Sequence, residues 1–240
     1  MKEIENKKEE ISKRTLISSI FVLLIVPLTI FMGVFVFDDR RYYFISILII
    51  LEILIPYFVS FSKKKPQARE LVIISVLCAL AVCSRAIMAM IPQVKPVLAI
   101  IIVAGICFGG ETGFLVGAIT AFVSNFYFGQ GAWTPWQMLA MGMVGFVAGI
   151  VFKKGFKKNR VTLAIYGFLS TIIIYGGILN PASVLLMMPE TVTLDAIIAS
   201  CVMGLPYDLI FAVSTALFLW LLAEDMIFRI ERIKTKYGLD

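Results

Sequence analysis

The sequence predicts an all-α protein, a polytopic bundle of transmembrane helices. Hydrophobic residues make up 60% of the 240 residues, well above the roughly 45–50% found in soluble domains. The apolar residues also fall into long runs, and a helix needs roughly 20 apolar residues to cross a bilayer core about 30 Å thick. A soluble globule of this size could not cover so much apolar side chain, so a membrane protein is predicted.

Eight apolar runs follow one another along the chain, separated by polar, basic or glycine-containing breaks such as DDRR, SKKKPQAR, GGE and KKGFKKNR. The charged start MKEIENKKEEISKR precedes a run that is too long for the core of a cleavable signal peptide. We therefore predict eight helices, over residues 15–37, 42–61, 71–90, 97–108, 112–128, 136–152, 161–179 and 196–223.

The positions of Lys and Arg test this helix count. Basic residues gather in the segments 1–14, 62–69, 153–160 and 224–240. Cytoplasmic loops are enriched in Lys and Arg, and with eight spans all four segments lie on that side. We expect a multi-pass protein of the cell membrane with both termini cytoplasmic. The net charge of +6 then faces an anionic inner leaflet, and nucleic acid is not a partner.

The residue types that most enzymes use are scarce. There is no histidine, which removes the commonest general base and the commonest metal ligand. The chain contains no GxSxG, HExxH or phosphate-loop pattern. Four cysteines lie in apolar runs without a CxxC pair, as small core residues do. We expect neither an enzyme, nor a metal site, nor a bound cofactor.

The stretch FGQGAWTPWQM at residues 128–138 is the most structured of the predicted outer loops. Its glycines permit unusual backbone geometry and its proline restricts it, so aromatic faces and amide groups would be held rigidly. Such a loop suits a planar organic ligand with polar edges. The alternative is that both tryptophans belong to the interfacial aromatic belt. The candidate ligand contacts in and near this loop are Asn125, Gln130, Trp133, Trp136, Gln137 and Asn180.

Two charged residues lie inside predicted spans. Arg85 lies about 22 Å along its helix from Glu70. Its side chain either snorkels to the outer surface or, with Lys95 above it, lines an outward-facing cavity that receives an anionic group. Asp208 lies mid-span, where a charge costs at least about 2.5–3.5 kcal/mol. In GLPYD the helix is expected to break and restart at Pro206, leaving Asp208 as a cap or as a ligand or cation contact.

Small residues recur at every fourth position in the third run, at Ser75, Ala79 and Cys83. A second row of small residues begins at Gly105 and continues across the GGE break. Small side chains let helices approach closely. These faces meet either other helices of this chain or another subunit, and the spacing does not distinguish the two.

On these stretches the chain resembles the substrate-specific (S) component of an energy-coupling-factor (ECF) transporter. The similar segments are SRAIMAMIPQVKP, FGGETGFLVGAITAFVSNFYFGQGAWTPWQM, YGGILNPAS and GLPYDLIFAVS, between residues 70 and 223. The resemblance implies a six-helix core that binds a vitamin or similar micronutrient from outside. It also implies a transmembrane T component and two ATPase subunits that drive uptake.

Carried over to this chain, the resemblance gives candidate roles to particular residues. Ser75, Ala79 and Cys83 would meet the T component. Residues 66–240 would form the six-helix core, and residues 1–65 would add a tail and two helices outside it. The central block resembles S components assigned to cobalamin more than those for thiamine or riboflavin, and cobalamin is therefore the first guess for the transported ligand. The residues near that ligand would be Trp133, Trp136, Gln137, Tyr175 and Asn180.

We therefore predict the substrate-binding subunit of an ATP-driven uptake system in a prokaryotic cell membrane. The alternative is a self-sufficient secondary transporter coupled to protons or cations, with Asp208 as the coupling carboxylate.

Overall fold

The computed structural model describes residues 19–36, 42–60, 68–153, 155–187 and 192–238. Every regular element in these ranges is helical, which confirms the all-α prediction. The α-helices are α2 (Val26–Val36), α3 (Tyr42–Ser60), α4 (Ala68–Ile87), α5 (Val97–Phe108), α6 (Gly110–Phe128), α7 (Trp133–Lys153), α8 (Arg160–Ser170), α9 (Gly177–Met187), α10 (Leu194–Phe218) and α11 (Glu224–Tyr237). The same ranges contain three π-helical segments. The segment η1 (Phe21–Ile25) precedes α2, η3 (Thr171–Gly176) joins α8 to α9, and η5 (Leu219–Ala223) joins α10 to α11.

The helices have the length and composition of a polytopic membrane protein. Four are long and apolar enough to cross a bilayer: Arg69–Ile87, Trp133–Lys153, Arg160–Met187 and Leu194–Tyr237. Shorter apolar helices cover Phe21–Met32, Tyr43–Ile55 and Val97–Phe108. Within the described residues, each of the eight predicted runs overlaps a helix or a continuous series of helices.

Several predicted helix ends are wrong. The helix α7 begins at Trp133 rather than at residue 136, so most of the predicted loop 128–138 is helical, and α4 ends at Ile87 rather than at residue 90. The seventh helix was expected to stop at residue 179, but α9 continues through Asn180 and Pro181 to Met187. The eighth continues past residue 223 into α11. Proline ends most soluble helices because it lacks an N–H donor. Transmembrane helices tolerate it because neighbouring helices, side chains and local π-helical turns satisfy the freed groups. The π-helical η3 directly precedes α9.

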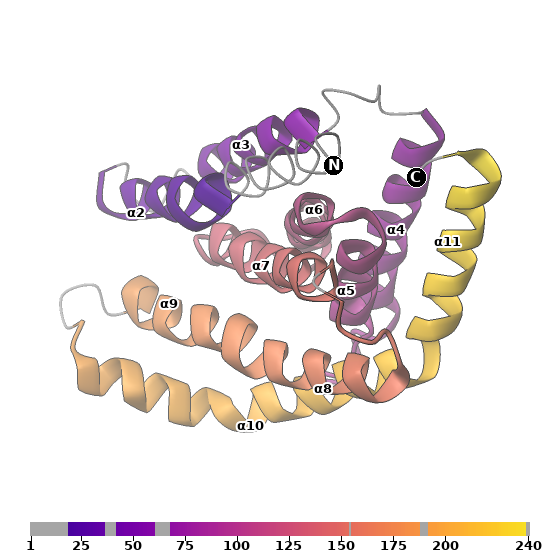
Figure 1. Cartoon of the computed structure of the whole chain (residues 1–240). Helices are drawn as coiled ribbons and strands as arrows, with labels where there is room; N and C mark the ends of the chain where they lie inside the picture. The colour runs from indigo at the N-terminus through magenta and orange to yellow at the C-terminus, as the bar shows by residue number, and fades with distance from the viewer. Residues whose placement is uncertain (1–18, 37–41, 61–67, 154, 188–191, 239–240) are drawn as a thin grey trace.

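The centre of the bundle is formed by α5, α6 and α7 (Figure 1). Glycines bring these helices into backbone contact: a Cβ atom added at Gly145 would lie 2.4 Å from the carbonyl oxygen of Gly113. The smooth row that begins at Gly105 therefore packs inside this chain. Around the centre, α4 covers α5 and α6, and η3 and α9 lie against α7 with α10 outside them.

The two N-terminal helices lie against α6 and α7 on the other side of the centre (Figure 1). The hydroxyl of Thr29 on α2 donates a hydrogen bond to Glu52 of α3 at 2.5 Å. The ring of Phe31 meets Trp136 of α7 edge-on, with centroids 6.1 Å apart. The described part of segment 1–65 is thus packed onto the rest of the chain, while the boundary at residues 65/66 lies outside the described residues and stays a prediction.

Candidate functional site

The start of α7, directly after the loop from α6, carries one exposed tryptophan, Trp133. The six-membered ring of Trp133 lies so close to Gly131 that a Cβ atom there would be 2.4 Å from it. Only glycine leaves room for this stacked ring. The side chain of Trp133 is 48% exposed, whereas Trp136 is buried against Phe31 and so is no surface belt residue. The indole nitrogen of Trp136 has no hydrogen-bond partner among the residues described.

The predicted amide side chains of this region do come together, but they bind one another. The Asn125 side-chain nitrogen donates to the Thr134 hydroxyl at 3.1 Å and to the Gln137 side-chain oxygen at 2.8 Å. The Thr134 hydroxyl donates to the Gln130 side-chain oxygen at 2.9 Å. Gln130 in turn donates to the carbonyl oxygen of Phe122 at 2.8 Å. This network fixes the start of α7 to the end of α6, and Thr134, which sequence reasoning missed, joins its two halves.

Arg85 lies next to this network. Its side chain is only 7% exposed, so it does not snorkel to the surface. One guanidinium nitrogen donates to the hydroxyl of Ser124 and, at 3.4 Å, to the side-chain oxygen of Asn125. The guanidinium carbon lies 4.9 Å from the centroid of the Phe128 ring. Ser124 and Phe128 were not predicted, although their i, i+4 spacing places them on one face of α6.

Lys95 reaches the same aromatic ring from the segment between α4 and α5. Its Nζ lies 5.3 Å from the centroid of the Phe128 ring. Its backbone N–H donates to the hydroxyl of Ser214 on α10 at 2.9 Å. Burial, and secondarily the positive charge of Arg85, lowers the pKa of Lys95 below its usual value. Arg85 and Lys95 therefore contact the same aromatic ring, while their role in an outward-facing cavity stays a prediction.

A second polar cluster joins α9 and α10. A carboxylate oxygen of Asp208 accepts a hydrogen bond from the Asn180 side chain at 2.7 Å. The Asn180 carbonyl oxygen accepts bonds from the hydroxyls of Ser183 and Ser200 at 2.6 and 2.8 Å. The predicted capping role of Asp208 is wrong, because α10 runs without a break through Pro206 and leaves no free helix start beside it. The two serines were missed in the sequence.

Tyr175 lies between the two clusters. Its ring is edge-on to Phe211 of α10, with centroids 5.1 Å apart. A Cβ atom at the neighbouring Gly176 would lie 2.4 Å from a carboxylate oxygen of Asp208, so glycine allows that carboxylate to reach the backbone of η3. η3, α9 and α10 thus meet at the second cluster.

The small residues of α4 face outward. Ser75, Ala79 and Cys83 are all exposed. An apolar cavity of about 280 Å³ opens beside Cys83, between α4, α5 and the α10–η5 segment. Within the described part of the chain, the face of α4 that carries Ser75, Ala79 and Cys83 is therefore not covered by other helices. Of the other cysteines, Cys78 and Cys107 are buried and Cys201 is partly so.

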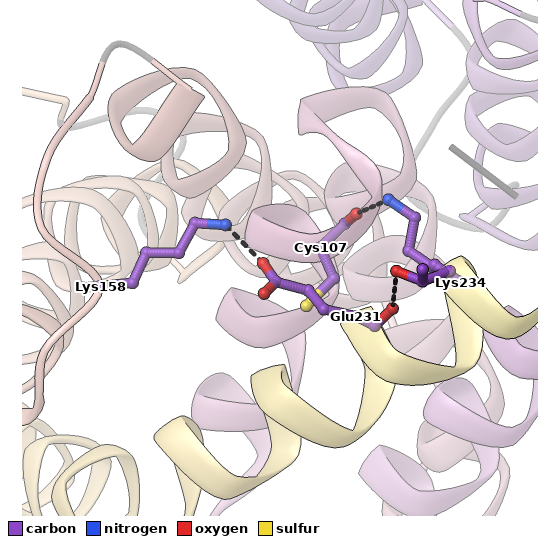
Figure 2. Close-up of polar contacts among 5 residues, drawn as sticks. Cys107, Lys158, Glu231 and Lys234 are labelled. Atoms are coloured by element: carbon purple, nitrogen blue, oxygen red, sulfur yellow. Dashed lines mark hydrogen bonds and ion pairs between the residues drawn. The ribbon is translucent and has the colours of Figure 1, made fainter.

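Cations at the other end of α5 are paired. Lys158 forms an ion pair with Glu231 of α11 at 2.8 Å, and Lys234 donates to the carbonyl oxygen of Cys107 at 3.0 Å (Figure 2). Arg160 forms a further 2.8 Å ion pair with Glu224. These contacts hold α11 against α5 and the start of α8.

Comparison with known proteins identifies the family. Residues 69–229 match the family model for the substrate-specific component of ECF transporters, which covers more than half of the chain. The chain belongs to this family. It is a family of transporter components and not of enzymes, and the predicted membership is confirmed without specifying a cobalamin type.

Two curated relatives of this S component are UPF0397 proteins. That of Vibrio atlanticus (strain LGP32) is 39% identical over 56 residues, which is 23% of this chain and 30% of the relative. That of Aliivibrio salmonicida (strain LFI1238) is 31% identical over 91 residues, or 34% of this chain and 49% of the relative. The matches thus span less than half of either relative's length. No solved structure matches the chain.

Proposed function

We propose that this S component is the membrane-embedded, substrate-binding subunit of an ATP-driven ECF-type uptake transporter. The observation that carries the proposal is the family match over residues 69–229. The subunit binds a vitamin or related micronutrient and performs no chemistry on it. Cobalamin is the first ligand to test, because the central sequence block resembles S components assigned to cobalamin more than those for thiamine or riboflavin.

The proposed binding site lies where the two polar clusters and the loop 128–138 converge. Polar and ionisable groups within a membrane bundle are costly and usually mark substrate pathways. Hydrogen bonds connect Arg85 to Asn125 and Asn125 to Gln137, and Gly176, the residue after Tyr175, lies against the carboxylate of Asp208. The proposed ligand-binding residues are Arg85, Lys95, Asn125, Gln130, Trp133, Trp136, Gln137, Tyr175 and Asn180.

The proposed partners are a transmembrane T component and two ATPase subunits. The exposed row Ser75, Ala79 and Cys83 supports an interface on α4, since small residues allow a partner helix to approach closely. In this proposal the protein lies in a prokaryotic plasma membrane, with both termini and the 153–160 segment cytoplasmic and the loop 128–138 outside.

The partner proposal is tested by purifying the tagged protein from its native membrane. T and ATPase subunits should co-purify with the wild type. Ala79→Trp should abolish co-purification and uptake but leave ligand binding intact, because the site lies on the other side of α4. Ile165→Trp, at an exposed position on α8, is the matched control and should retain the complex. Loss of folding in Ala79→Trp alone would show that Ala79 serves internal packing.

The same preparation tests the rival secondary transporter. Purified protein in liposomes, without ATPase subunits, should show no uptake when a proton gradient is imposed. Gradient-driven uptake that is lost in Asp208→Asn would overturn the proposed function and make Asp208 the coupling group.

A further inference from the structure

The cations Arg85 and Lys95 have no carboxylate partner in the described part of the chain. The described hydrogen bonds of the Arg85 guanidinium group go to neutral oxygens, those of Ser124 and Asn125. Lys95 engages only its backbone groups in hydrogen bonds, with Ser214, and its ammonium group faces the Phe128 ring. The carboxylate of Asp208 is hydrogen-bonded to Asn180 instead.

Both positive groups also contact the same aromatic ring. Both lie within 5.3 Å of the centroid of one ring, that of Phe128. Arg85 is buried, and the charge of Arg85 acts on Lys95. Two like charges in a poorly hydrated place repel each other and are each costly unless an opposite charge joins them. The described residues of the resting protein supply aromatic and hydroxyl contacts here but no opposite charge.

We propose that this pair is the recognition site for an anionic group of the substrate, a carboxylate or a phosphate. The inference rests on the proposed substrate-binding function and names its ligand class. The planar guanidinium fork can bind two oxygens of either group side by side, and the Lys95 ammonium adds a point charge. The guanidinium group donates hydrogen bonds to the uncharged oxygens of Ser124 and Asn125, which hold the fork in place without neutralising it.

The test measures binding of three matched pairs of probes to the purified full-length protein in detergent. Each pair differs in the anionic group: nicotinate and nicotinamide, pantothenate and panthenol, pyridoxine 5′-phosphate and pyridoxine. At least one anionic probe should bind about 100-fold more tightly than its neutral counterpart. The pairs distinguish a carboxylate-binding site from a phosphate-binding one.

Variants locate the preference. Arg85→Gln should remove the preference for the anionic probe, and Lys95→Gln should reduce that preference about tenfold. Because Lys95 lies outside the helices, Lys95→Gln tests the site even if Arg85→Gln disturbs folding. Arg160→Gln, the same change at a paired and exposed arginine, should leave it unchanged. The proposal is wrong if no anionic probe binds better than its neutral counterpart, or if the preference persists in both site variants. Co-purification of ATPase subunits in either case would leave the proposed function standing.

Discussion

The positively charged side chains near the two ends of α5 differ in their partners. Near its start, Arg85 and Lys95 share one aromatic ring and have no carboxylate in the described part of the chain. Near its end, Lys158 and Lys234 have oxygen partners, and Arg160 is paired nearby at the start of α8. Twelve helical residues, roughly 18 Å, separate the two ends of α5.

If the proposed anion site is right, the difference separates charges that serve the fold from charges that bind a ligand. Exposed ion pairs are typically worth about 0–1 kcal/mol, and those on α11 position a helix. A buried cation without a counter-ion destabilises the empty protein, so its presence indicates a function for which an opposite charge arrives from outside. Substitutions near either end of α5 can test this comparison.

The largest effect on ligand binding is expected when Arg85, near the start of α5, is given a carboxylate partner within the chain. Asn125→Asp preserves side-chain size and places a carboxylate where the Asn125 oxygen now accepts from Arg85 at 3.4 Å. The internal carboxylate should then compete with the ligand's anionic group. We expect anionic-probe binding to weaken at least 100-fold, about 2.8 kcal/mol at 1.4 kcal/mol per decade. Isothermal titration calorimetry measures the change.

The matched control for this variant is Asn159→Asp. Asn159 caps α8, and aspartate caps a helix about as well as asparagine. This control should bind ligand like the wild type. Unchanged ligand binding in Asn125→Asp would mean that Arg85 does not meet the ligand's charge, and the comparison between the two ends would fail.

An intermediate effect is expected from pH. The pKa of Lys95 is lowered by burial and by the charge of Arg85, while Phe128 and Ser214 beside it are neutral. Lys95 is protonated below that pKa, so affinity for an anion should be highest there and fall as pH rises through it. A loss of about tenfold is expected, or about 1.4 kcal/mol.

The pH dependence is measured as the dissociation constant of the tightest-binding carboxylate probe, which stays ionised throughout. Lys95→Gln should show a flat profile, because Arg85 keeps its charge over the whole range. A fall in affinity that persists in Lys95→Gln would assign the titration to another group.

Much of this fold follows from apolar run length, because crossing a bilayer fixes how many apolar residues a helix needs. The ends near Asn180 and Pro206 could not be predicted this way, since helix-breaking residues act differently once neighbouring helices satisfy the backbone. The residue types of the site were visible in the sequence. Their partners were not: Ser124 meets Arg85 across 39 positions of sequence, and Trp136 is buried by contact with α2.

The smallest effect is expected at the paired end. Glu231→Gln removes the carboxylate from the 2.8 Å ion pair with Lys158. The side chains of Lys158 and Glu231 are 39% and 50% exposed. Pairs this exposed contribute at most about 1 kcal/mol, so the thermal unfolding midpoint should fall only slightly. Because salt screens exposed charges, that fall should disappear near 1 M salt. Anionic-probe binding should be unchanged, since the pair lies at the far end of α5. A clear loss of binding would mean that the attachment of α11 by the Lys158–Glu231 pair affects the ligand site, so that this ion pair supports binding as well as the fold.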